Sequence, residues 1–299
     1  MGAARLLAGL VRVVPPADIT AIVNVGDDVE LHGLHVSPDL DTVTYTVAGA
    51  IDPERGWGLA GETWHAMEAL GRYPSPVAWF NLGDRDLATH LFRTDRRRAG
   101  APLSQICGEI AQAWNLGIHL LPVTNDRLQT RVTITDGTEI GFQEYFVQRQ
   151  HSVAVTAVRF DGAEAARPAP GVIEGITTAS RVIIAPSNPL VSIAPVLAVA
   201  GVEEAVRARR ADTVAVSPII AGAALKGPAD RLLRELGHES SVVGVARLYA
   251  PIAATLVVDE ADADQLDAVQ AEGIRCVVAP TIMRDGPSAA ALGQVVLGL

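Results

Sequence analysis

The segment ITAIVNVGDDVELHGLHVSPDLDT, residues 19–42, decides the fold class. It opens with an apolar, β-branched run that is typical of a buried strand. The loop after this run carries four aspartates in two close pairs: Asp27, Asp28, Asp39 and Asp41. Pro38 then suits the first turn of a helix. A strand, an acidic loop and a helix in this order indicate an α/β protein, in which ligands bind beyond the carboxyl ends of parallel strands.

The rest of the chain alternates short apolar runs with amphipathic stretches. In the second half, with helices between them, strands are predicted at Arg181–Ala185, Thr213–Ser217, Ala253–Val258 and Arg275–Val278. This alternation predicts a Rossmann-like, mostly parallel sheet with helices on both faces. The exception is Arg131–Val147, where TDGT joins two alternating runs and predicts a hairpin.

These patterns predict a single domain over residues 1–299. Its Rossmann-like core comprises residues 1–50 and 161–299. Residues from about 51 to 160 are expected to form an inserted helical and hairpin subdomain. The sequence FDGAEAARPAPG, residues 160–171, is the clearest seam between the two parts.

Composition narrows the class of protein. A formal net charge of −10 argues against sequence-independent binding of nucleic acid, which needs a basic surface. No apolar run approaches the ~20 residues of a transmembrane helix, and the first residues lack a signal-peptide cleavage site. The two isolated cysteines, Cys107 and Cys276, are too few for a disulfide framework or a zinc cage. We therefore expect a cytoplasmic protein without nucleic-acid or membrane partners.

Two further loops follow predicted strands and should meet the acidic loop in one crevice. The first is APSNPLVSI, residues 185–193, where Ser187, Asn188 and Ser192 could cradle a phosphate or could simply cap a helix. The second is SPIIAGAALKGPAD, residues 217–230. Here Lys226 could contact a phosphate as a point charge, or could be an ordinary surface lysine.

The acidic loop itself has more than one interpretation. Asp39 is expected to cap the following helix. Asp41 could turn into the crevice with Asp27 or Asp28, and two such carboxylates would supply the hard oxygen ligands that Mg²⁺ prefers. Solvated caps and turns are the alternative. His32 and His35 could join a transition-metal site with the aspartates, although they lack the i, i+4 spacing of a helical pair.

Two segments of the predicted insertion carry unusual side chains. In WFNLGDRDLATHLFRTDRRR, residues 79–98, Arg85, Thr89 and Arg93 fall on one side of a helix. This face could bind an anionic substrate or could be solvated. Trp57, in a glycine-rich stretch, could stack on a planar ring or belong to the core.

Several motifs occur in a fixed order along the chain: SPDLDT, LGDRDLATH, PSNP and VAVSPIIAGAALKGPAD. With these motifs the chain resembles, over essentially all 299 residues, the transferase family of coenzyme F-420 biosynthesis. Its members are the 2-phospho-L-lactate transferases of archaea and the phosphoenolpyruvate transferases of actinobacteria. The resemblance implies transfer of a phosphoenolpyruvyl or 2-phospholactyl group from a guanylylated donor to the ribityl hydroxyl of the deazaflavin Fo, with release of GMP. It also implies Mg²⁺ as cofactor and a homodimer.

The resemblance also assigns residues. It implies that Asp27 and Asp41 are catalytic and bind Mg²⁺, with Asp28 as the reserve ligand, and that Asp41 holds or deprotonates the hydroxyl of Fo. The Fo pocket would further contain Asn81, Gly83, Asp84 and Arg85. The donor site would contain Gly2, Ser187, Asn188, Ser192 and Lys226.

The chain departs from the family at its start. The family opens with an apolar strand and a glycine-rich loop, and Gly2-Ala3-Ala4-Arg5 matches only the tail of that loop. We therefore expect the first, central strand to be missing from this chain, through a start assigned too far downstream or through truncation. Its absence would leave backbone groups of the neighbouring strands unpaired.

Two other functions fit the same features less closely. One is a metal-dependent nucleotide phosphohydrolase that uses the same carboxylates. The other is a non-catalytic regulator that binds a nucleotide or nucleotide sugar, because proteins of the gluconeogenesis-factor type resemble this fold. The second aspartate of DLDT and the segment NLGDRDLATH favour the transferase, since they would serve an acceptor pocket.

Overall fold

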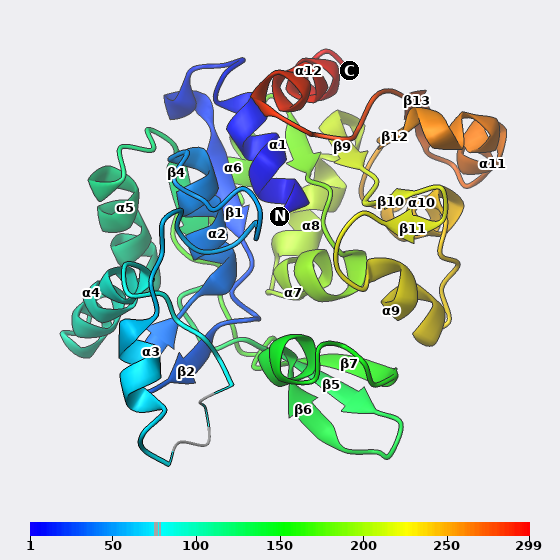
Figure 1. The fold of residues 1–299 in the computed structure, drawn as a ribbon. Helices are drawn as coiled ribbons and strands as arrows, with labels where there is room; N and C mark the ends of the chain where they lie inside the picture. Colours follow the sequence, from blue (N-terminus) through cyan, green and yellow to red (C-terminus); the bar gives the residue numbers. More distant parts are fainter. Residues whose placement is uncertain (75–76, 78) are drawn as a thin grey trace.

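The computed structural model describes residues 1–74, 77 and 79–299. Its parallel strands form two sheets (Figure 1). The larger has the order β13-β12-β9-β8, all parallel, from Arg275–Val278, Thr255–Val258, Thr213–Val216 and Val182–Ile184. The smaller pairs β1 (Thr20–Val23) with β4 (His119–Pro122), also in parallel. The four strands predicted in the second half are confirmed, with their ends within two residues of the predicted positions.

Helices cover both faces of the larger sheet. Every residue of β9 is buried, and its side chains alternate between the faces. Val214 and Val216 pack in one cluster with α1 (Gly2–Leu10) and α12 (Gly286–Leu297). Ala215 packs in the other cluster with α8 (Val202–Ala208) and α10 (Val242–Tyr249). The predicted α/β class, with a parallel sheet between helices, is confirmed.

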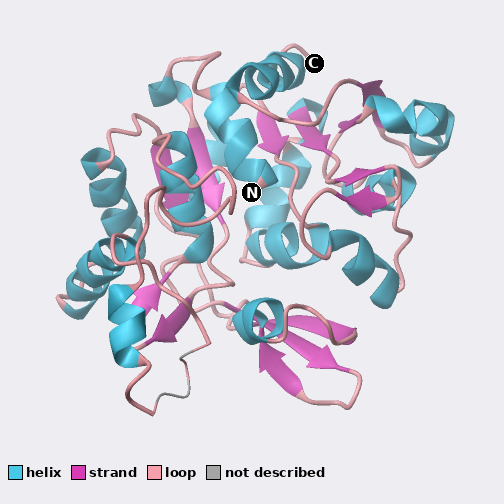
Figure 2. Ribbon diagram, in the orientation of Figure 1, coloured by secondary structure: helices cyan, strands magenta, loops and turns pink. Residues whose placement is uncertain are grey.

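The predicted hairpin is also confirmed, with a shorter second strand. β5 (Gln129–Ile134) pairs antiparallel with β6 (Glu139–Gly141) and with β7 (Val155–Asp161). The chain leaves the sheet after Gly141 and forms a helical turn at Glu144–Gln148, where a strand up to Val147 was predicted. This three-stranded sheet lies apart from the parallel strands (Figure 2).

The acidic loop contains a hairpin that the sequence pattern did not predict. β2 (Val29–Leu31) and β3 (Leu34–Val36) pair antiparallel across a two-residue turn. His32 and Gly33 in that turn have φ values of 53° and 73°, the left-handed geometry that two-residue hairpins require. α2 (Pro38–Val47) follows, with Pro38 in its first turn as expected.

The remaining elements connect these layers. Between α2 and the three-stranded sheet lie α3 (His65–Leu70), α4 (Asp86–Arg98) and α5 (Leu103–Ala113). The short helical elements are η1 (Pro16–Asp18), α6 (Val172–Thr178), η3 (Pro189–Ile193), α7 (Ala194–Leu197), η4 (Arg210–Asp212), α9 (Ala229–Glu235), η5 (Glu260–Gln265) and α11 (Leu266–Ala271). A small hairpin joins β10 (Ile219–Ile220) to β11 (Ala223–Ala224).

The two parallel sheets share one hydrophobic cluster, which includes Val23 of β1 and Ile184 of β8. Within the described residues β1 and β8 do not pair with each other. β4 lies inside the range 51–160, so the predicted insertion contributes a strand to the parallel layer. No single helix of the described chain is long and apolar enough to cross a membrane. The helical segments Pro189–Leu197 and Val202–Ala208 reach that length and apolar composition only when taken together, and they are bent by 93° relative to each other.

Candidate functional site

A cleft of about 760 Å³ opens where the predicted loops meet. It is lined by the acidic loop after β1, by the loop after β8 and by the loop after β9. The N-terminus of α1 also reaches it, near the centre of the molecule (Figure 1). The expectation that these three loops converge is confirmed, because the carboxyl ends of parallel strands meet at one edge of a sheet.

Asp27 and Asp39 form a like-charged pair at this cleft. Asn24 lies beside them, and its Nδ2 donates to Asp39 Oδ2 at 3.0 Å. Burial, and then the charge of Asp39, raise the pKa of Asp27 well above its ordinary value. Burial also raises the pKa of Asp39. Since Asp27 Oδ1 is buried and has no hydrogen-bond partner among the described residues, the pair fits a divalent cation that would relieve the repulsion.

The expectation that Asp39 caps the helix is wrong. Ser37 occupies the N-cap position, and Asp39 lies in the first turn with its carboxylate bound to Asn24. Ser37 Oγ instead donates to Asp28 Oδ2 at 2.8 Å. His35 Nε2 lies 2.9 Å from the same oxygen, so this histidine holds Asp28. Asp28 Oδ1 is buried and has no partner in the part of the chain that the structure describes, which leaves this oxygen available to a cation bound at Asp27 and Asp39.

Asp41 points away from Asp39, toward α4. Two residues along a helix turn a side chain by about 200°, so the two carboxylates face opposite sides. Arg93 binds Asp41 through both oxygens: Nη1 donates to Oδ2 at 3.2 Å, and Nη2 donates to Oδ1. Both side chains are buried. The helix face on which Arg93 was expected to meet substrate or solvent is therefore internal at this position.

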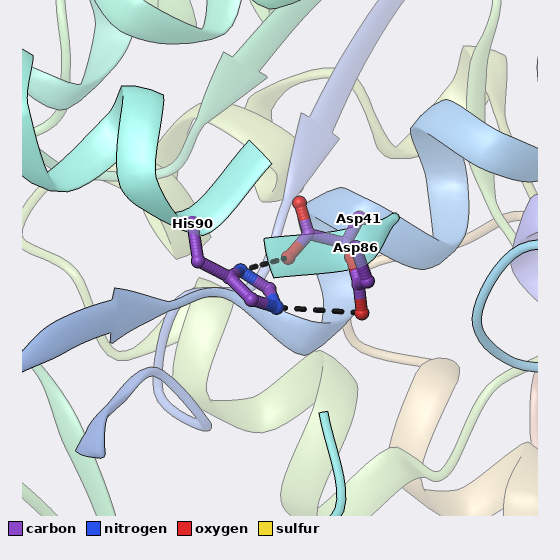
Figure 3. A group of neighbouring side chains, drawn as sticks. All are labelled: Asp41, Asp86 and His90. Carbon is purple, nitrogen blue, oxygen red and sulfur yellow. Dashed lines mark ion pairs between the residues drawn. The ribbon is translucent and has the colours of Figure 1, made fainter. Parts of the chain in front are cut away.

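His90 lies between Asp41 and Asp86 (Figure 3). Its Nδ1 is 3.6 Å from Asp41 Oδ2, and its Nε2 is 3.3 Å from Asp86 Oδ2. The three residues offer ligand atoms within 4.8 Å of one another and could hold a metal ion. Arg93 makes these three residues a poor metal site, because its guanidinium is already bound to both oxygens of Asp41 and its positive charge repels a cation. The Asp27 and Asp39 pair fits a cation better.

Sequence reasoning did not single out Asp86 or His90. The available signal was their i, i+4 spacing in DLATH, which places both on one face of α4. Tyr45 of α2 completes the group: its hydroxyl donates to Asp86 Oδ1, and it lies 2.9 Å from Thr89 Oγ1.

The residues expected in the acceptor pocket separate into two sets. Asn81 lines the cleft, as do its neighbours Trp79 and Phe80. Asp84 accepts hydrogen bonds from three donors of another segment: Thr63 Oγ1, His65 N and Ala66 N. These bonds hold the start of α3 and lower the pKa of Asp84.

Gly83 and Arg85, also expected in the acceptor pocket, contact the segment that precedes α3. The Arg85 side chain donates to the carbonyl of Ala60. A Cβ on Gly83 would lie 2.2 Å from the Glu62 side chain. Gly83, Asp84 and Arg85 thus support the wall of the cleft, while Asn81 belongs to its surface.

Trp57 is 47% exposed and lines the cleft, so the alternative that it belongs to the core is wrong. The Arg55 guanidinium lies 5.4 Å from the ring centre of Trp57 and 4.9 Å from that of Trp64. Phe142 and Phe146 of the three-stranded sheet region, which stack on each other, also line the cleft. The cleft therefore combines aromatic surface with carboxylates.

All five residues expected to bind the donor line the cleft: Gly2, Ser187, Asn188, Ser192 and Lys226. A Cβ on Gly2 would lie 2.3 Å from the carbonyl oxygen of Pro186, so only glycine lets α1 approach this loop. Asn188 Oδ1 accepts from Leu190 N at 2.9 Å, the capping role given as its alternative. Lys226 is exposed and forms no ion pair with any residue that the structure describes.

Known proteins match this chain over its length. The model of the family "2-phospho-L-lactate transferase CofD" matches residues 1–282. The chain is 44% identical to a "Phosphoenolpyruvate transferase" of Nocardia farcinica, covering 100% of this chain and 92% of that protein. It is 45% identical to one of Streptomyces griseus, covering 100% and 95%.

A solved structure matches more distantly. A UPF0052-family protein from Bacillus halodurans aligns with a TM-score of 0.63 at 16% identity, covering 99% of this chain and 96% of that chain. This likeness supports the fold alone. The family match extends over nearly the whole chain and agrees with relatives whose alignments cover all of this chain and 92% and 95% of their own length. The chain belongs to the 2-phospho-L-lactate transferase CofD family.

Proposed function

We propose that this chain transfers a phosphoenolpyruvyl or 2-phospholactyl group from a guanylylated donor to the terminal ribityl hydroxyl of the deazaflavin Fo. GMP is the leaving group, and the product belongs to coenzyme F-420 biosynthesis. Family membership and the names of the relatives support a transferase. The observation that carries the proposal is the pair of Asp27, which is buried, and Asp39, which is half-buried, in the cleft that also contains the expected donor-binding residues.

We assign Mg²⁺ to Asp27 and Asp39, with Asp28 beside them. This assignment replaces Asp41 of the sequence expectation by Asp39, because Arg93 occupies both oxygens of Asp41. A Mg²⁺ ion there would neutralise charge on the diphosphate of the donor, which phosphoryl transfer requires.

The donor and the acceptor would take different parts of the cleft. Lys226, with the hydroxyls of Ser187 and Ser192, offers positive charge and hydrogen-bond donors for a diphosphate. Trp57, Trp79 and Phe80 offer flat apolar surface for the deazaflavin ring. Aligning nucleophile and leaving group in one cleft is the main task of such an enzyme.

A homodimer and a cytoplasmic location belong to the same proposal. Leu91 and Phe92, adjacent on α4, are 57% and 42% exposed. Neighbouring exposed apolar side chains are typical of a contact with another protein. Sedimentation of the purified protein would test the dimer.

The test of the activity combines the protein with Mg²⁺, Fo and one donor. The enolpyruvyl donor and the lactyl donor are used in separate reactions. Mass spectrometry should detect GMP and a heavier deazaflavin in equal amounts. GMP without modified Fo would indicate a phosphohydrolase. Tight nucleotide binding without any turnover would indicate a regulator, and either result would contradict the proposal.

A further inference from the structure

A chain of buried polar groups leads from Arg93 to the cleft. Arg93 Nη1 lies 3.3 Å from His90 Nδ1. A guanidinium only donates hydrogen bonds, so Nδ1 must be the acceptor and the imidazole carries its proton on Nε2. That Nε2–H faces Asp86 Oδ2 at 3.3 Å. Arg93 thus fixes the tautomer that presents a donor to Asp86.

Asp86 is the member of this chain that the cleft exposes. The side chains of His90 and Arg93 are each 1% exposed, whereas that of Asp86 is 16% exposed and lines the cleft. Tyr45 donates to its other oxygen, Oδ1. One hydrogen bond from Tyr45 of α2 and the nearby imidazole of His90 on α4 therefore position the carboxylate, while part of it stays open to a ligand.

We infer that Asp86 is a catalytic residue, the carboxylate that accepts the proton of the attacking hydroxyl. This inference rests on the proposed function. As the hydroxyl oxygen forms its bond to phosphorus, its proton passes to Asp86, and the bond from phosphorus to the oxygen of GMP breaks with its electron pair. His90, Tyr45 and Arg93 are positioning residues, which act through Asp86.

Asp41 is less suited to this task. Both of its oxygens are bound by Arg93, and the side chain is 6% exposed. A base must reach the hydroxyl within hydrogen-bond distance. Asp41 is less exposed than Asp86, at 6% against 16%, and both of its oxygens are engaged by a positively charged guanidinium, which makes it a weaker proton acceptor. A role for Asp86 limited to the helix dipole would not need a buried imidazole and a phenol aimed at its two oxygens.

Asp86→Asn tests the inference, with Asp95→Asn as matched control. Asp95 is an exposed aspartate on the same helix, and it lies outside the cleft lining. The readouts are kcat and KM for Fo from GMP release and product mass, together with GDP binding and a thermal melt. Asp86→Asn should lower kcat by about 100-fold or more, within the range for general bases, while KM, GDP binding and melting stay near wild type.

Tyr45→Phe provides a second, milder variant. It removes one donor from Asp86 and should lower kcat severalfold, with KM for Fo unchanged. A kcat of Asp86→Asn close to that of Asp95→Asn would overturn the inference and leave the proposed function intact. A raised KM for Fo with normal kcat would do the same, since Asp86 would then only bind the acceptor. Absence of transfer by the wild-type protein would overturn both.

Discussion

Asp39 and Asp41 lie two residues apart on α2 and bind different partners. Asp39 accepts a hydrogen bond from Asn24 beside Asp27, and Asp41 is held through both oxygens by Arg93. The first turn of one helix thus faces the proposed cation site on one side and a buried ion pair on the other. The roles of the two aspartates are therefore separable by mutation.

The cation site predicts a stability change that needs no assay of activity. Addition of MgCl₂ should raise the melting temperature of the wild-type protein. At a Mg²⁺ concentration of 100 times the Kd, binding should add about 2.7 kcal/mol to the free energy of unfolding. Asp39→Asn should lose this Mg²⁺-dependent shift, and without Mg²⁺ it should melt higher than wild type because repulsion with Asp27 is relieved. Asp41→Asn should keep the shift. A shift lost only in Asp41→Asn would restore the sequence-based ligand choice.

The ion pair of Arg93 and Asp41 predicts a large loss on breaking it. Arg93→Met leaves a buried carboxylate without its partner and should lower the free energy of unfolding by about 3–5 kcal/mol. The double variant Arg93→Met with Asp41→Leu should recover part of this loss, because no buried charge remains. Urea unfolding monitored by circular dichroism measures both. A loss below about 1 kcal/mol for Arg93→Met, the range of exposed pairs, would contradict the burial of this pair.

The hydrogen bonds of Asp259 should make part of the free energy of unfolding depend on pH. Burial favours a higher pKa, but the N–H and O–H of Thr281, at 2.9 and 2.8 Å, outweigh it and hold the pKa of Asp259 below its usual value. The stabilisation is present above the unfolded pKa of about 3.9 and is lost as pH falls through the lower folded pKa. Asp259→Asn should therefore destabilise the protein at pH 7 and differ less from wild type near pH 3. Urea midpoints at both pH values measure this, and an equal gap at both would contradict it.

At Gly9, where α1 packs against α12, there is no room for a side chain. A Cβ there would lie 2.2 Å from the carbonyl oxygen of Ala289, so Gly9→Ala should cost about 1–3 kcal/mol through displaced helices. Gly108 is the matched control, an exposed glycine on α5 with open space around its Cβ position. Gly108→Ala should instead stabilise by up to about 1 kcal/mol. Thermal melts that shift in the same direction for both variants would refute the close contact.

Removal of the positive charge of Lys226 should weaken binding of the guanylylated donor substrate. A hydrogen bond to a charged group contributes about 1.5–3 kcal/mol, so Lys226→Met should raise the KM for the guanylylated donor about tenfold or more. The KM for Fo should change little. Arg97→Met on α4, exposed and outside the cleft lining, controls for the loss of one positive charge. Equal donor KM values for the two variants would remove Lys226 from the donor site.

Much of the site's position could be predicted from the sequence. The strand at the start of the acidic loop, the four strands of the second half and the TDGT hairpin are local patterns of hydrophobicity and turn residues. The rule that ligands bind beyond the carboxyl ends of parallel strands then brought Asp27, Ser187 and Lys226 to one cleft, and the structure has them there.

The partners of individual side chains needed the tertiary structure. Arg93 lies 52 residues from Asp41, and only the packing of α4 against the start of α2 turns a helix face that reads as solvated into a buried ion pair. The same packing brings Asp86 and His90 beside Asp41 and leaves Asp39 to Asn24. The sequence by itself determined the class of fold and which loops form the cleft, because those depend on local periodicity and strand direction. The tertiary structure decided which carboxylate lies beside Asn24, which pairs with Arg93 and which is exposed in the cleft, since partner choice over long separations depends on helix rotation and burial.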